Sequence, residues 1–177
     1  MTETGTTQID LALFVLRVVF GLFFVAHGAK KVSNGVTGTA GYFASIGMKW
    51  PRLQARMAMS TEIGASLLFA AGLLTPLAAA GIIGVMLVAK FAAHRKAGFF
   101  IFLPKPGWEY VISIAVVGAV VAISGPGTWS LDHALGLDAD TWGGTWGSAI
   151  IGIGLGVVSS VAQMAICFRP PVPADAG

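Results

Sequence analysis

Several ionisable side chains lie within or beside long apolar stretches of this sequence, where charge is costly. They are Arg17, His27, Glu62, Lys90, His94 and Glu109. An arginine at the centre of a membrane helix costs about 2.5–3.5 kcal/mol on insertion scales, so Arg17 is expected to have a partner. Ionisable groups inside a membrane are candidate functional groups by default.

These residue types fit the handling of a quinone and its protons. A histidine or an arginine could hold a carbonyl oxygen in an apolar groove between helices, and a carboxylate could relay a proton. Quinone is therefore the candidate cofactor. No metal site is predicted, because no two of these residues show a ligand spacing such as His-x-x-x-His within one helix. Haem held by His27 or His94 is a further alternative.

The composition is that of a membrane protein. Hydrophobic residues make up 55% of the chain and charged residues 11%, whereas soluble domains are about 25% charged. The net charge of +3 comes with no basic face or recognition motif, so no nucleic-acid partner is expected. The single cysteine, Cys167, excludes an internal disulfide and a thiol pair.

The apolar stretches predict an all-α transmembrane fold, since a spanning helix needs about 20 residues. The predicted helices cover residues 9–28, 52–74, 76–97, 108–124 and 144–168. A short amphipathic piece at 40–46 is expected at the membrane interface. The first ten residues contain no Lys or Arg, so the first helix is expected to be retained rather than removed as a signal peptide.

The distribution of cations predicts the orientation in the cell membrane. With helices at these positions, all Lys and Arg residues except Arg17 fall on one side. They are Lys30, Lys31, Lys49, Arg52, Arg56, Lys90, Arg95, Lys96, Lys105 and Arg169. Positive residues favour the cytoplasmic side, which predicts that the N-terminus lies outside and the C-terminus lies in the cytoplasm.

Depth along the helices predicts a partner for Arg17. Glu62, Lys90, His94, His27 and Glu109 form a layer in the cytoplasmic half, and Arg17 lies ~7 Å above Glu62 at 1.5 Å per residue. Because an extended arginine covers most of that gap, Arg17–Glu62 is the leading pair and Lys90 is the rival cation. Alternatively, the pair could only fix helix register, and the terminal residues could simply extend to the interface.

Small residues in the last helix predict close helix packing. Gly143, Gly147, Gly152 and Gly156 form small-xxx-small pairs, with Ser148 beside them. We interpret this stripe as a docking surface for a second copy or for another membrane subunit.

Motifs along residues 11–132 together resemble the DoxX family of small membrane proteins. They are LRVVFGLFFVAHGAKKV, GYFASIGM, GLLTPLAA, MLVAKFAAH and GPGTWSLD, in this order. The resemblance implies a four-helix membrane bundle over residues 1–132. Residues 133–177 would then hold an outer loop, an additional transmembrane helix and a disordered tail. Positions matching the family's recurring polar residues are Arg17, His27, Glu62, His94 and Glu109.

The resemblance also implies a link to redox chemistry. Related proteins include the small subunit of an archaeal thiosulfate:quinone oxidoreductase, and mycobacterial members are linked with redox and thiol homeostasis through soluble partners. The leading hypothesis is a redox-linked membrane subunit that contacts quinone and works with an oxidoreductase partner. The alternative is a non-catalytic assembly or anchoring subunit. A small transporter is less favoured, because no inverted repeat is visible.

Overall fold

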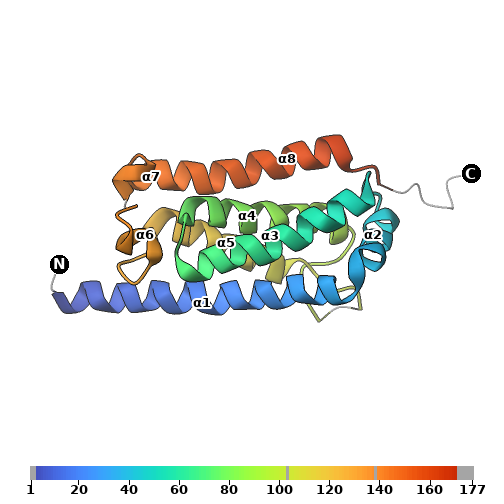
Figure 1. Ribbon diagram of the computed structural model, residues 1–177. Coiled ribbons are helices and arrows are strands. Elements are labelled where there is room, and N and C mark those ends of the chain that lie inside the picture. The colour runs from blue at the N-terminus through green and yellow to red at the C-terminus, as the bar shows by residue number, and fades with distance from the viewer. Residues whose placement is uncertain (1–2, 103, 138, 171–177) are drawn as a thin grey trace, which may run out of the picture.

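The computed structural model describes residues 3–102, 104–137 and 139–170, and it confirms the all-α architecture. Five antiparallel helical columns form one elongated bundle in this part of the chain (Figure 1). The columns are α1 (Glu3–Ser33), α3 (Pro51–Ala71), α4 (Thr75–Val88) continued by the π-helix η1 (Ala89–Ala93), α5 (Glu109–Ser124), and α7 (Gly144–Ala149) continued through the π-helix η3 (Ile150–Gly154) into α8 (Leu155–Cys167).

The length and composition of these helices suit a bilayer. Thr6–Ser33, Thr75–Ala93 and Trp146–Cys167 are each long and apolar enough to span it, and α5 is a shorter apolar helix. The column built on α3 is more polar, since it carries Gln54, Thr61 and Glu62. Many large apolar side chains on α1 and α8 face outward, as expected for surfaces that contact lipid.

Helix α4 is the centre of the bundle. It packs against α3, α5 and α8, while α1 packs mainly on α3. Because α4 is apolar on all sides, every face can be buried, and Ala79, Ile82, Ile83 and Met86 form part of the core. The last column, α8, therefore belongs to the same bundle as the four helices that precede it.

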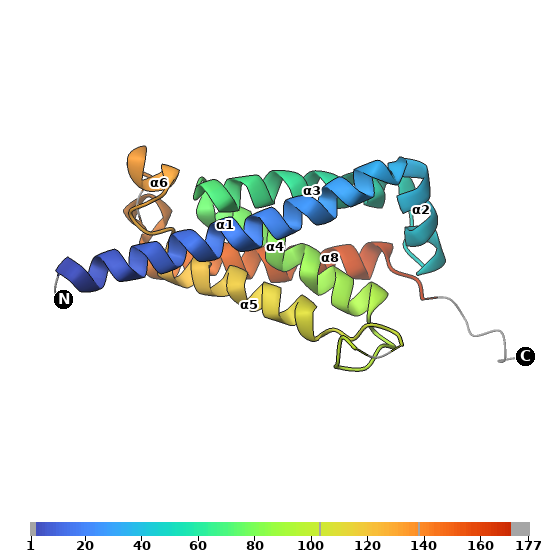
Figure 2. The same cartoon turned by 90° about the horizontal axis from the view of Figure 1, so that it is seen from below.

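The two ends of the bundle differ in charge. Helix α2 (Gly35–Ser45), the start of α3, the end of η1 and the end of α8 lie at one end, here called the basic end. The start of α1, α6 (Leu131–Ala134) and the 3-10 helix η2 (Ala139–Trp142) lie at the other, the loop end (Figures 1 and 2). Every Lys and Arg residue except Arg17 belongs to segments at or near the basic end, as the helix assignment predicted.

Helix α2 closes the basic end. The Thr39 hydroxyl donates to the Lys31 carbonyl (3.2 Å). The segment after α2 pairs with the end of α8, because the Lys49 amide donates to the Cys167 carbonyl (2.7 Å) and the Arg169 amide donates to the Gly47 carbonyl (2.8 Å). These contacts hold α2 across the basic end of the bundle. Of the tail predicted to be disordered, residues 171–177 lie outside the described residues.

Candidate functional site

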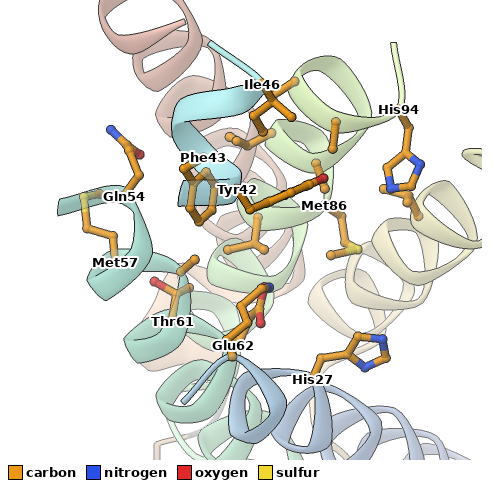
Figure 3. Close-up of a pocket in the computed structure, with 18 of the residues that line it drawn as sticks. His27, Tyr42, Phe43, Ile46, Gln54, Met57, Thr61, Glu62, Met86 and His94 are labelled. Atoms are coloured by element: carbon orange, nitrogen blue, oxygen red, sulfur yellow. The ribbon is translucent and has the colours of Figure 1, made fainter. Parts of the chain in front are cut away.

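A cavity of about 240 Å³ lies inside the basic end of the bundle (Figure 3). Its walls are mostly apolar, with isolated polar side chains from several helices. The lining residues are Phe24, His27 and Lys31 of α1, Tyr42, Phe43 and Ile46 of α2 and its end, Gln54, Met57, Ala58, Thr61 and Glu62 of α3, Val85, Met86, Val88, Ala89, Ala92, Ala93 and His94 of α4 and η1, Tyr110, Val111 and Ile114 of α5, and Gln163 of α8.

Glu62 is the buried acid of this cavity. Its side chain is only 4% exposed, and its Oε1 accepts a hydrogen bond from Lys31 Nζ in an ion pair. The second carboxylate oxygen, Oε2, is buried and has no hydrogen-bond partner among the described residues. Since a buried acceptor without a donor is costly, this oxygen indicates a place for a hydrogen-bond donor from outside the protein.

His94 and Tyr110 form a second polar group on another wall. His94 Nδ1 lies 2.9 Å from the Pro106 carbonyl, and the Tyr110 hydroxyl lies 2.9 Å from His94 Nε2. His94 follows the π-helix η1, and its amide donates to the Ala89 carbonyl, five residues back. The ring lies against Tyr110 of α5. Such π-turns are frequent at functional sites.

Further polar groups complete the lining. Gln163 Nε2 of α8 donates to Gln54 Oε1 of α3 (2.6 Å). Tyr42 and Phe43 of α2 lie on the side of the cavity opposite Glu62 and His27 (Figure 3). Partial burial raises the pKa of the Tyr42 hydroxyl, so this phenol is neutral at neutral pH. An apolar cavity with a few such groups suits a small, flat, amphipathic molecule.

The predicted Arg17–Glu62 pair is wrong. Arg17 is fully buried, and its Nη1 donates to the Ala70 carbonyl (3.1 Å) and its Nη2 to the Trp129 carbonyl (2.6 Å). Helical side chains lean toward the N-terminus of their own helix. Because α1 and α3 are antiparallel, Arg17 leans toward the loop end, while Glu62 leans toward the basic end and meets Lys31.

The other predicted residues are divided between the cavity and its surroundings. His27 lines the cavity, with Nδ1 2.8 Å from the Phe23 carbonyl. Lys90 is not the cation of Glu62: its Nζ lies over the rings of Phe91 (4.5 Å) and Trp108 (4.6 Å). Glu109 begins α5 and is half-buried, but it is not part of the cavity lining. The structure thus brings His27, Glu62 and His94 around one cavity.

The interpretation of the glycine stripe as a docking surface is also wrong for its inner part. A Cβ at Gly152 would lie 2.6 Å from Ala122 Cβ, and one at Gly156 would lie 2.9 Å from Ile83 Cβ. These glycines therefore let α8 and its π-turn approach α4 and α5 of the same chain. Gly143 and Gly147 lie at the start of α7, where the nearest atoms belong to their own turn.

The loop end holds a separate polar cluster that the sequence interpretation missed. Asp132 is 1% exposed, and its two carboxylate oxygens accept the backbone amides of Leu74 (2.7 Å) and Thr75 (2.9 Å) at the start of α4. Asp10 similarly accepts the amide and hydroxyl of Thr128. Together with Arg17, these contacts fix the loop after α5 to α1, α3 and α4, so the cluster is structural.

Asp132→Ala is expected to lower the free energy of unfolding by about 1–2 kcal/mol, because it removes the acceptor of two amides at the start of α4. Thermal unfolding of the purified protein in detergent measures the change. Asp140→Ala is the control, since Asp140 is an exposed acid in the same outer region. Equal unfolding midpoints for the two variants would contradict the capping role.

The polar lining residues missing from the sequence interpretation are Lys31, Tyr42, Gln54, Thr61, Tyr110 and Gln163. Lys31 lies three residues after Gly28, where an added Cβ would be 3.2 Å from Glu62 Cβ, and this proximity is visible only in the structure. The predicted helix ended at Gly28, whereas α1 continues to Ser33. Gln54 and Gln163 are far apart in the sequence and carried no signal of pairing.

Known proteins resemble this chain over the same bundle. Residues 12–95 match the family model described as DoxX. The inner membrane protein YphA of Escherichia coli (strain K12) is 32% identical over 124 residues, which cover 68% of this chain and 88% of that protein. No solved structure gives a significant match. The family match includes His27, Lys31, Glu62 and His94, and it ends before Tyr110.

Proposed function

Because the chain belongs to the DoxX family of integral membrane proteins, we propose that it is a redox-linked membrane subunit that binds a quinone ring in the cavity of the basic end. The observation that carries this proposal is a set of polar groups on different walls of one apolar cavity, of which Glu62 is buried and the others are half-buried. Glu62 with Lys31 lies on one side, and Tyr110 with His94 lies on α5 and η1.

The size and chemistry of the cavity support a ring ligand. An apolar cavity of roughly 150 Å³ holds benzene, so about 240 Å³ has room for a ring with small substituents. Two ring oxygens would reach polar groups on different helices, while apolar residues such as Met86 and Ile114 would contact the ring faces. When bound, a quinone supplies two-electron chemistry, and this chain supplies binding, orientation and hydrogen-bonding groups.

The proposal includes an orientation in the membrane. The cations gathered at the basic end favour the cytoplasmic side, and the relative YphA is named an inner membrane protein. The cavity would then open toward the cytoplasmic half of the cell membrane, with the N-terminus outside. An oxidoreductase partner would exchange electrons with the bound ring from that side.

We expect saturable binding of a short-tailed benzoquinone to the protein in lipid nanodiscs. The matched test is Ala58→Phe, which fills the cavity from α3, with Glu109→Gln as the control outside the lining. Ala58→Phe should weaken binding at least tenfold, because the larger ring takes the space of the ligand. Calorimetric titration measures both variants.

Empty nanodiscs define partitioning of the quinone into lipid. Binding of equal affinity to the wild type and to Ala58→Phe would contradict the proposed site. A loss of binding in Glu109→Gln as large as that in Ala58→Phe would place the ligand elsewhere.

A further inference from the structure

We propose that the cavity selects the reduced, dihydroxy form of its ring ligand, a hydroquinone, over the quinone. The inference rests on the proposed function, since it concerns the redox state of the same ligand. It follows from the hydrogen-bonding roles left open by the contacts within the protein. A quinone carbonyl only accepts hydrogen bonds, whereas a hydroquinone hydroxyl both donates and accepts.

The wall formed by α5 offers an acceptor. The Pro106 carbonyl can only accept, so His94 Nδ1 (2.9 Å) must carry the hydrogen. In the neutral ring, Nε2 is then the acceptor, and Tyr110 must donate its hydroxyl hydrogen to it (2.9 Å). The Tyr110 hydroxyl can therefore only accept a hydrogen bond from a ligand, through a lone pair of its oxygen. A quinone carbonyl could use the Tyr110 hydrogen only if His94 Nε2 lost its donor.

The wall formed by α1 and α3 offers an acceptor beside a donor. Glu62 Oε2 has no hydrogen-bond partner in the described part of the chain, while Oε1 is paired with Lys31. Because Oε2 has no exposed surface, the Glu62 carboxylate must turn toward the cavity that it lines for a ligand hydroxyl to donate to it and accept a hydrogen from the Lys31 ammonium. A quinone carbonyl oxygen at the same point can accept a hydrogen bond from the Lys31 ammonium. Its partial negative charge, however, is repelled by the negative charge of the Glu62 carboxylate.

The remaining polar groups do not favour the quinone. His27 Nδ1 lies 2.8 Å from the Phe23 carbonyl, which again leaves Nε2 of the neutral ring as an acceptor. The Tyr42 hydroxyl can donate or accept. In the Gln54–Gln163 pair, one amide group and one carbonyl remain for other partners. The discrimination therefore lies with Glu62 and Tyr110, which come from different helices.

Selective binding of the reduced form has a measurable electrochemical consequence. If the hydroquinone binds tenfold more tightly than the quinone, the midpoint potential of the bound two-electron couple rises by about 30 mV relative to the free couple. One hydrogen bond lost at a buried polar group changes affinity by about tenfold. Glu62 is such a group and the half-buried Tyr110 hydroxyl adds to its effect, so at least tenfold preference is expected.

The test compares a ligand series on the same ring in nanodiscs. A short-tailed benzoquinone, its hydroquinone kept reduced under argon, and the dimethyl ether of the hydroquinone are titrated by calorimetry. The hydroquinone should bind at least tenfold more tightly than either of the others, since the ether has lost both donors. If the hydroquinone binds no more tightly than the quinone, the proposed selectivity is overturned and the proposed function remains intact. Binding of neither would overturn the proposed function itself.

Variants locate the discrimination. Glu62→Gln replaces an acceptor with an amide that can donate, so the preference for hydroquinone should fall toward unity. Because Tyr110→Phe alone would uncover His94 Nε2 as a new acceptor, it is combined with His94→Phe. The double variant removes both acceptors of this wall while leaving the Lys31–Glu62 ion pair, and it should reduce the preference several-fold even if Glu62→Gln fails to fold. Glu109→Gln, outside the lining, should keep the wild-type ratio. An unchanged ratio in the folded double variant and in folded Glu62→Gln would overturn the assignment of these groups.

Discussion

Replacing Arg17 with alanine is expected to lower the thermal unfolding midpoint of the protein in detergent by about 6–12 °C. The guanidinium is fully buried and joins α1 to the last turn of α3 through Ala70 and to the outer loop through Trp129. It also lies at the C-terminal end of α3, where the helix dipole favours a cation. The truncation would leave two carbonyls without donors, open a cavity and remove the positive charge near Asp132.

The size of the effect follows from the two carbonyls left without donors, at about 1–2 kcal/mol each, which together give about 3 kcal/mol. A change of 1 kcal/mol shifts the midpoint by roughly 2–4 °C for a chain of this length. Arg17→Lys should lie between alanine and the wild type, because an ammonium lacks the planar fork that reaches two carbonyls.

Arg169→Ala is the matched control for Arg17. Arg169 also donates to carbonyls at the end of a helix, Ala165 and Phe168, but it is exposed. Its loss should change the midpoint by no more than about 2 °C. Midpoints of Arg17→Ala and Arg169→Ala that agree within error would contradict the structural role given to Arg17.

The bundle could be predicted from the sequence because hydrophobic length is a strong constraint in a bilayer. The predicted helix at 52–74 corresponds to α3, Pro51–Ala71, and the predicted helix at 108–124 corresponds to α5, Glu109–Ser124. Pro51 and Pro76 mark helix starts in the sequence, as proline does at a first turn. The predicted end of the first helix at residue 28 is too early, because Lys30 and Lys31 favour a loop in the sequence while α1 continues to Ser33.

The candidate site was only partly predictable, for two physical reasons. Depth along a helix says how far apart two residues are in the direction of the axis, but not which way their side chains lean, and Arg17 and Glu62 lean apart. The second reason is η1, Ala89–Ala93. His94, which follows this π-turn, contacts Pro106 and Tyr110, whereas Lys90 lies over the rings of Phe91 and Trp108, and regular helical spacing does not predict these partners.

The glycine stripe shows the same limit, because small residues predict close packing but not the packing partner. Gly152 meets Ala122 of α5 and the Pro76 carbonyl of α4, both within this chain. A bulky side chain there would separate the last helix from the bundle. The consequence should therefore be a loss of stability rather than a change in the number of copies that associate.

Gly152→Leu is expected to lower the thermal unfolding midpoint by about 6–12 °C. Even a Cβ would lie 2.6 Å from Ala122 Cβ, and overpacking a close contact costs about 3 kcal/mol.

Gly154→Leu is the control on the same π-turn. Its nearest neighbour, Ile150 Cγ2, is 4.0 Å from an added Cβ. That variant should keep the midpoint within about 2 °C, because glycine is replaced by a better helix former in open space. Light scattering should give the same particle mass for both variants and the wild type. An altered mass with an unchanged midpoint in Gly152→Leu would show instead that the stripe joins separate chains.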